Sequence, residues 1–285
     1  YSLSFDGVDN EVSINYSENS LFQLSSSLTI SFWVKSQNHS QVSEVAFLNR
    51  ATSNGDSWSI GKNQNSGLFW HIFTDQNCWT VVAGGDIIPI NEWIFVTATY
   101  DGSYAKLYVD GNLVAEELCN GSINPTTVPL MIGSDESQYY SQSIIDNIVV
   151  WDIVLNETEI SQAMNQSIIN ENNIVGYWNF NAGEGTTLAD QTSNGNNGTI
   201  VGATWSDDVP ATSTGGGDAD YQNVADELII SWSGSDEVSG ISTYEYALGT
   251  TSGGTDAIDW TSTDTSTADT VSNLSLSDGQ IYYLS

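Results

Sequence analysis

The chain has 285 residues, and 36 acidic residues against 4 Lys and Arg give it a formal net charge of -32 at pH 7. This charge repels polyanions, so we exclude nucleic acids and acidic membrane surfaces as partners. All apolar runs fall well short of the roughly 18 residues that a spanning helix needs, so we expect no membrane insertion. The length predicts about two domains.

The first part of the chain consists of short alternating runs separated by polar turns. Alternation of apolar and polar residues predicts strands within residues 1–14, 27–35 and 45–50, and further strands follow in SWSIGKN and GLFWHIF. These runs recur about every ten residues, with Gly, Asn and Ser between them. The spacing predicts an all-β sandwich or barrel.

Residues 91–114 carry the clearest signal, that of a β-hairpin. A strand from Trp93 ends at the turn Asp101-Gly102, and a second strand ends at Asp110-Gly111. Asp-Gly pairs tolerate the positive φ of a tight reversal. Both faces of the first strand carry apolar side chains, which predicts a central strand covered on both sides.

A buried strand, one helix and a polar loop follow this hairpin. The strand is IIDNIVVWD, and the helix begins at Asn156, with Glu159 as its capping-box partner and Ile160 and Met164 at helical spacing. IVGYWNF then returns to strand. The polar loop GEGTTLADQTSNGNNG and the strand TIVGATW complete the first domain, which we place at residues 1–209.

A second, smaller domain follows a linker. Residues 210–217 are rich in Pro, Thr and Gly without a hydrophobic period, which indicates a linker. Residues 218–285 predict about five strands. Leu276 and Tyr282, on either side of Asp278-Gly279, resemble the tyrosine corner of fibronectin type III and immunoglobulin-like sandwiches. This resemblance implies a partial, truncated sandwich with an exposed edge.

The chain has two cysteines, Cys78 and Cys119. Cys78 lies in an alternating run and Cys119 follows the hairpin, so the two are expected on neighbouring strands. A disulfide would form in an oxidising compartment, and two buried thiols are the alternative.

Six blocks over residues 1 to about 209 resemble the laminin G-like, or concanavalin A-like lectin, superfamily, including the pentraxins. They are FDGVDNEVSI, LTISFWVK, NEWIFVTATYDGSYAKLYVDGNLV, IGSDE, IIDNIVVWDIVLNETEI and GYWNFNAGEGTTLADQTSNGNNGTIVGATW. The resemblance implies a jelly roll of two antiparallel sheets that often carries calcium and often binds sugars or protein surfaces. The second domain is similar to the spacers of large secreted bacterial proteins.

The run DQTSNGNNG offers oxygens at alternate positions around a flexible glycine, as a hard cation requires. The resemblance implies calcium held between this loop and neighbouring strands. The expected ligands are Asp190, Thr192, Asn194, Asn196, Asp146 and Asp6. The alternative is an Asx-rich loop held by hydrogen bonds without metal.

A ligand site is expected from acidic loops and exposed aromatic rings. The similarity to pentraxins implies that Asp56 meets Asp135 and Glu136 on one face, and the alternative is that these are unrelated surface acids. Flat aromatic faces can cover the apolar face of a pyranose. The candidate rings are Trp58, Trp70, Trp79, Tyr139 and Tyr140.

The sequence argues against catalysis, because it lacks the Glu-x-Asp-x-x-Glu strand of concanavalin A-like glucanases. The leading hypothesis is a calcium-stabilised binding module of a secreted or cell-surface adhesin, which recognises carbohydrate or an extracellular protein. It would form part of a longer chain with further domains. The alternatives are a structural stalk module and an accessory domain of a glycan-degrading enzyme.

Overall fold

The computed structural model divides the chain into two compact units, residues 1–212 and 213–285. The boundary falls inside the segment that the sequence marks as a linker. The structure describes residues 1–18, 21, 23–38, 44–52, 56–63, 67–78, 81–85, 87–135, 139–165, 170–210, 227–231, 245–249, 255–262, 268–272 and 283–284.

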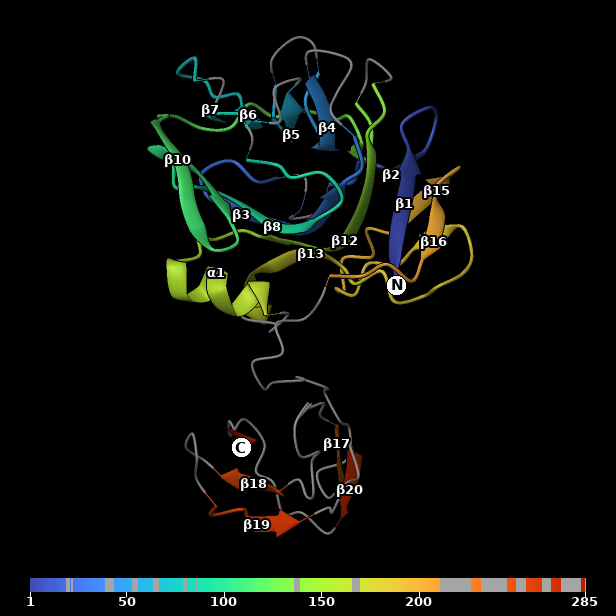
Figure 1. The fold of residues 1–285 in the computed structure, drawn as a ribbon. Helices are drawn as coiled ribbons and strands as arrows, with labels where there is room; N and C mark the ends of the chain where they lie inside the picture. The colour runs from blue at the N-terminus through green and yellow to red at the C-terminus, as the bar shows by residue number, and fades with distance from the viewer. Residues whose placement is uncertain are drawn as a thin grey trace. The chain divides into compact units, whose positions relative to one another are not determined.

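Unit 1 is a sandwich of two antiparallel sheets, as the sequence predicts (Figure 1). In the first sheet, the order is β10-β9-β8-β3-β12-β1-β16, and β13 also pairs with β12. Its strands are β1 (Ser2–Asp6), β3 (Leu28–Ser36), β8 (Trp93–Tyr100), β9 (Tyr104–Val109), β10 (Asn112–Leu118), β12 (Gln142–Trp151), β13 (Ile174–Trp178) and β16 (Thr204–Ser206).

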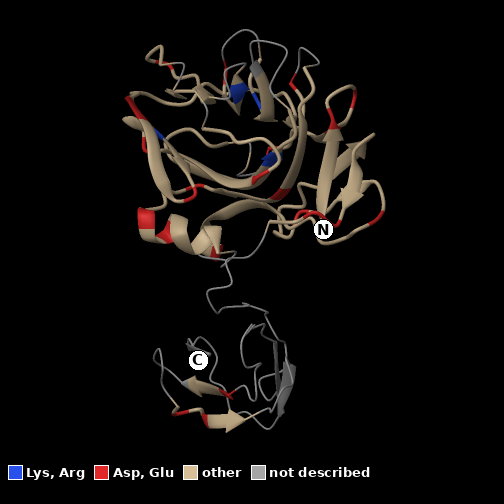
Figure 2. Ribbon diagram, in the orientation of Figure 1, with Lys and Arg blue, Asp and Glu red and all other residues tan. Residues whose placement is uncertain are grey.

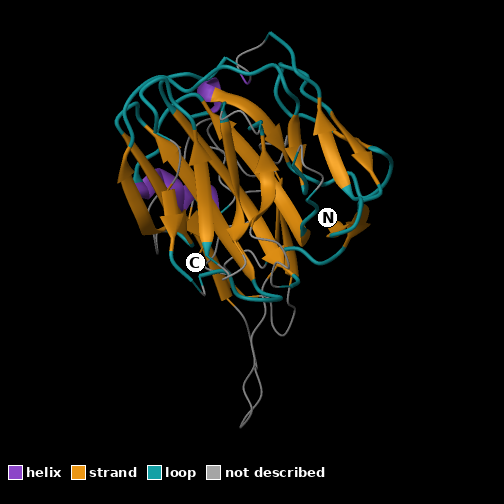
Figure 3. Cartoon of the chain, turned by 90° about the horizontal axis from the view of Figure 1, so that it is seen from above, coloured by secondary structure: helices purple, strands orange, loops and turns teal. Residues whose placement is uncertain are grey.

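The second sheet has the order β14-β15-β2-β11-β4-β5-β6-β7. Seen from above in Figure 3, strands of the two sheets overlie one another, with loops gathered at their ends. Its strands are β2 (Glu11–Ile14), β4 (Glu44–Asn49), β5 (Trp58–Asn63), β6 (Leu68–Ile72), β7 (Val81–Ala83), β11 (Leu130–Ile132), β14 (Thr187–Leu188) and β15 (Gly198–Val201).

The expected hairpin is confirmed as strands β8 and β9, and β10 extends it by a second turn. Gly102 and Gly111 have φ of 86° and 76°, a conformation that glycine adopts without steric cost. Strand β8 is buried on both faces apart from the partly exposed Trp93. It is a central strand, with β3 on one side and β9 on the other.

Two apolar clusters cover the two faces of the first sheet. The larger one fills the space between the sheets. The smaller one lies beneath helix α1 (Glu157–Met164) on the outer face, where Trp33, Phe95 and Trp151 of the sheet pack with Leu155 and Ile160. Burial of this second face is why β8 and β12 read as nearly continuous apolar runs.

The predicted capping box of α1 is present. The Asn156 side chain accepts from the Glu159 N–H at 3.1 Å, and Glu159 Oε2 accepts from the Asn156 N–H at 2.8 Å. A short 3-10 helix, η2 (Glu171–Asn173), leads into β13. None of the helices in the described part of the chain has the length and apolar character to cross a bilayer.

The described residues of unit 2 form two small antiparallel sheets. Strand β17 (Glu227–Ser231) pairs with β20 (Ala268–Ser272), and β18 (Glu245–Gly249) pairs with both β19 (Ile258–Ser262) and β21 (Tyr283–Leu284). The residues of the expected tyrosine corner lie outside the described residues, so the fibronectin-like assignment stays a prediction.

Candidate functional site

Cys78 and Cys119 form a disulfide with a Cα–Cα distance of 5.2 Å. The bond joins the turn that follows β6 to the segment that follows β10. Hydrogen bonds next to it tie the same two segments together, since Thr74 Oγ1 donates to the Asn120 carbonyl at 2.7 Å. The expected disulfide is therefore present in the structure, and the alternative of two thiols is not.

In the loop around Asp190, the carboxylate is already surrounded by hydrogen-bond donors. Its Oδ1 accepts from the N–H groups of Tyr177 and Thr192, at 3.2 and 2.9 Å. Its Oδ2 accepts from Thr192 Oγ1 and from the Asn196 N–H, both at 2.8 Å. Four donors thus point at the two oxygens that were expected to hold a cation.

The same loop covers the edge of β13 that does not face β12. The Nδ2 groups of Asn194 and Asn196 both donate to the Val175 carbonyl, at 3.0 and 3.2 Å. The Gln191 N–H donates to the Tyr177 carbonyl at 2.7 Å. Side chains and backbone of the loop therefore satisfy groups that a neighbouring strand would otherwise pair.

The other expected calcium ligands lie apart from each other. Asp6 is opposite Gln142 on β12, and Asp146 lies four residues further along β12, about 13 Å away at the rise of a strand. Asp6 Oδ1 instead accepts from the Val8 N–H at 2.8 Å. In the described part of the chain, no group of three or more His, Cys, Asp or Glu side chains could hold a metal ion. Asp6 and Asp146 therefore do not lie together, and calcium binding by the Asp190 loop stays a prediction beside the alternative of a loop held by hydrogen bonds.

Asp146 is a buried carboxyl group with an incomplete hydrogen-bond environment. It is 6% exposed, and its Oδ1 has no hydrogen-bond partner. Trp33 lies directly opposite on β3, and its buried Nε1 also has none. Removal from water raises the pKa of Asp146 to about 7, because burial disfavours the ionised form.

The structure does not bring Asp56 and Asp135 together. Asp56 lies in the hairpin after the last residue of β4, where its Oδ1 accepts from the Thr52 N–H at 2.8 Å. Asp135 follows β11, which runs antiparallel to β4, and the register therefore carries it toward the opposite end of β4. The two acids belong to separate loops, contrary to the expected common face. Glu136 lies outside the described residues.

The prediction that Trp58 and Trp70 offer exposed rings to a sugar is wrong. Trp58 and Trp70 are 1% and 0% exposed, because their positions on β5 and β6 face the core between the sheets. Alternation predicts that a strand has two faces but does not say which one is buried. Tyr139 is 47% exposed and Tyr140 is partly exposed, so both remain accessible. Trp79 lies outside the described residues.

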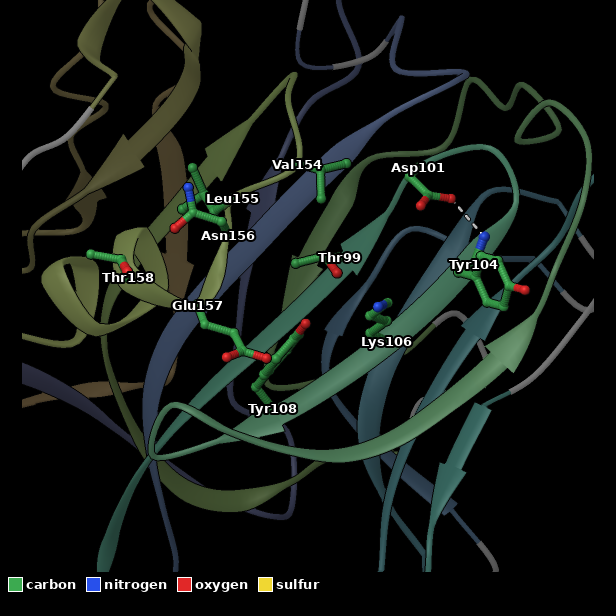
Figure 4. A pocket seen from close by; sticks show the side chains of 10 residues that line it. All are labelled: Thr99, Asp101, Tyr104, Lys106, Tyr108, Val154, Leu155, Asn156, Glu157 and Thr158. Atoms are coloured by element: carbon green, nitrogen blue, oxygen red, sulfur yellow. Dashed lines mark hydrogen bonds between the residues drawn. The ribbon is translucent and has the colours of Figure 1, made fainter.

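A hollow of about 460 Å³ lies on the outer face of the first sheet, where the start of α1 approaches β8 and β9 (Figure 4). Strand alternation places Tyr104, Lys106 and Tyr108 of β9 on this face. The remaining wall comes from the turn after β8 and from the segment that enters the helix. The lining residues are Thr99, Asp101, Tyr104, Lys106, Tyr108, Val154, Leu155, Asn156, Glu157 and Thr158.

The hollow combines an exposed ring with charged and polar groups. Tyr104 is 41% exposed. The Lys106 ammonium lies 6.0 Å from the centre of that ring and 2.8 Å from Glu116 Oε2. Asp101 Oδ1 accepts from the Tyr104 N–H, drawn as a dashed line in Figure 4. Burial raises the pKa of Tyr108, and the negative charge of Glu157 adds to this effect.

The sequence did not predict this hollow. The alternation in YAKLYV is a signal that Tyr104, Lys106 and Tyr108 share a face. No local pattern relates β9 to the start of α1, about fifty residues further along the chain. A second hollow of about 600 Å³ lies between β13 and the Asp190 loop, and its lining includes Asp152, Glu171 and Tyr177.

Two stacked antiparallel sheets of this order form a sandwich of the jelly-roll class. The chain belongs to the Concanavalin A-like lectin/glucanases superfamily, whose family model matches residues 6–161, more than half of the chain.

Individual relatives are more distant. The chain is 29% identical to human pappalysin-1 over 109 residues, which cover 36% of this chain and 7% of that protein. It is 26% identical to botulinum neurotoxin type E of Clostridium butyricum over 166 residues, 53% of this chain and 13% of the toxin. The chain thus spans only a small part of each relative's length.

A solved structure shares the fold. A Bacteroides ovatus protein, assigned provisionally to carbohydrate binding, superposes with a TM-score of 0.58 at 16% identity, over 74% of this chain and 61% of that protein.

Proposed function

We propose that unit 1 is a non-catalytic module that binds carbohydrate in the hollow between β9 and the start of α1. The observation that carries the proposal is the exposed ring of Tyr104 beside ionisable and amide side chains in one open depression. Carbohydrate sites need this combination of a flat apolar face with polar groups around it.

The aromatic ring and its polar neighbours would contact different parts of the sugar. The Tyr104 ring would cover the apolar face of a pyranose. Asp101 and Glu157 would accept hydrogen bonds from sugar hydroxyls, and the Asn156 side chain is already committed to the helix cap. The chain lacks the acidic strand motif of the glucanases in its superfamily, so binding without hydrolysis is the function that we assign.

The wider context of the module is part of the same proposal. The fold shared with the Bacteroides ovatus protein supports a carbohydrate ligand, and the disulfide favours an oxidising, extracellular compartment. We infer a secreted or cell-surface parent protein in which this module serves adhesion.

A pair of tyrosine variants tests the site. Tyr104→Ala should weaken binding to any glycan captured on an array at least about fivefold, as truncation of a central aromatic anchor does. Tyr139→Ala removes a ring of similar exposure from the loop that the sequence favoured, and binding should be unchanged. Both affinities are measured by titration of the captured glycan. If Tyr139→Ala abolishes binding and folded Tyr104→Ala does not, the site lies elsewhere.

A further inference from the structure

We propose that the hollow selects sugars by charge, accepting neutral and amine-bearing glycans and rejecting acidic ones. This inference rests on the proposed carbohydrate-binding function and names the class of ligand for the same site. The chain has four Lys and Arg residues, and all four lie at described positions.

Two of the four cations are buried away from any surface ligand. Lys62 is 1% exposed, and its ammonium donates to Ser36 Oγ at 2.6 Å. Arg50 is also 1% exposed and donates to Ser57 Oγ at 3.1 Å and to the Thr126 carbonyl at 2.9 Å. Neither group can reach a glycan carboxylate or sulfate.

The other two cations are near the surface, and each contacts a carboxylate of its own. Lys35 Nζ lies 2.7 Å from Asp208 Oδ2. Lys106, the cation of the hollow, lies 2.8 Å from Glu116 Oε2. Figure 2 shows the contrast, with few basic positions and acidic ones spread over turns and helix α1. An acidic sugar would have to displace Glu116 to pair with Lys106.

The start of α1 already carries negative charge. Its first N–H groups favour anions, but the Glu159 carboxylate, which completes the capping box with Asn156, already lies among them. Glu157 adds another negative charge to the same turn.

The carboxylates of the hollow face solvent. Asp101 and Glu157 are exposed. A like charge at about 6 Å in water lowers an association constant about threefold, so the two carboxylates together disfavour an acidic sugar about tenfold. The same carboxylates attract a protonated amine, and Glu157 is its natural partner.

The test uses two pairs of related glycans whose members differ in charge. Lactose is compared with 3′-sialyllactose, and triacetylchitotriose with the glucosamine trimer at pH 6, where the sugar amines are protonated. These four and a broader array are probed with the full chain at low and at high salt. We expect the acidic member to bind about tenfold more weakly than its neutral partner and the amine to bind more tightly. High salt should narrow both differences.

Two charge variants assign the effect to the hollow. Glu116→Gln releases Lys106 from its ion pair and should reduce the penalty for 3′-sialyllactose about threefold. Glu117→Gln changes the net charge equally but lies on the other face of β10, so the penalty should remain.

Two further outcomes would overturn the charge selection alone or the carbohydrate function as well. Acidic glycans that bind as tightly as their neutral partners would overturn the charge selection while the carbohydrate function stands. Failure of every glycan on the array to bind would overturn the carbohydrate function and this inference with it.

Discussion

Two regions on either side of β13 use a carboxylate in opposite ways. At its outer edge, Asp190 accepts four hydrogen bonds and holds a loop against the strand. At the neighbouring strand β12, Asp146 is buried with an oxygen that has no partner. Burial of an acid therefore says little by itself about its role, because the hydrogen-bond donors around the carboxylate differ from one site to the next.

The largest expected effect concerns Asp146. Its folded pKa of about 7 lies above the value of about 3.9 for an unfolded aspartate, so the folded state keeps its proton over a wider range. Below pH 4 the protonated Asp146 therefore adds about 3–4 kcal/mol to the free energy of unfolding, and this stabilisation is lost as the pH rises to 7. Asp146→Asn should remove this part of the pH dependence.

Urea unfolding of both proteins between pH 4 and pH 8 measures the difference. The many other acids of the chain affect both proteins alike and cancel in the comparison. If Asp146→Asn changes stability equally at all pH values, the carboxyl group is ionised throughout and the contrast between the two regions fails.

A smaller loss of stability is expected when the hydrogen bonds to the Asp190 carboxylate are removed. Asp190→Ala leaves the N–H groups of Tyr177 and Asn196 without their acceptor and should lower the free energy of unfolding by about 2–3 kcal/mol. Thr192→Val removes one donor only and should cost about 1 kcal/mol. Denaturant titrations at pH 7 check both values. Equal stability of Asp190→Ala and the unchanged chain would refute the role of the loop.

The smallest effect is expected from calcium. An ion bound only by the folded state raises the melting temperature by mass action. Since the oxygens of Asp190 are occupied by donors, and Asp6 and Asp146 lie apart, we expect equal melting temperatures in calcium and in EDTA. A rise of several degrees in calcium would restore the metal site that the sequence predicted.

Local patterns predicted the parts of the fold whose partners are near in sequence. The Asp-Gly turns of the hairpin and the Asn156–Glu159 capping box were both expected, and both are present. The disulfide was expected as one of two alternatives because both cysteines flank strands.

The candidate site was less predictable, because it depends on which strands become edges and which faces become buried. The oxygens around Asp190 suggest a cation site. The sequence does not show that they lie beside an edge of β13 that has no neighbouring strand. Trp58 has a flat ring that could stack on a sugar, but its side chain is buried in the core. The hollow unites Tyr104 with Glu157, and no periodicity links them.

The position of β1 also determines when the module can be completed during synthesis. Leu3 faces Ile145 on one side and Trp205 on the other. Strand β1 is synthesised before the rest of this unit, so it must wait for almost the whole unit before both of its partners exist. Contacts of such long sequence separation make folding slow, and until then the nascent chain exposes an unpaired strand that neighbouring chains can capture.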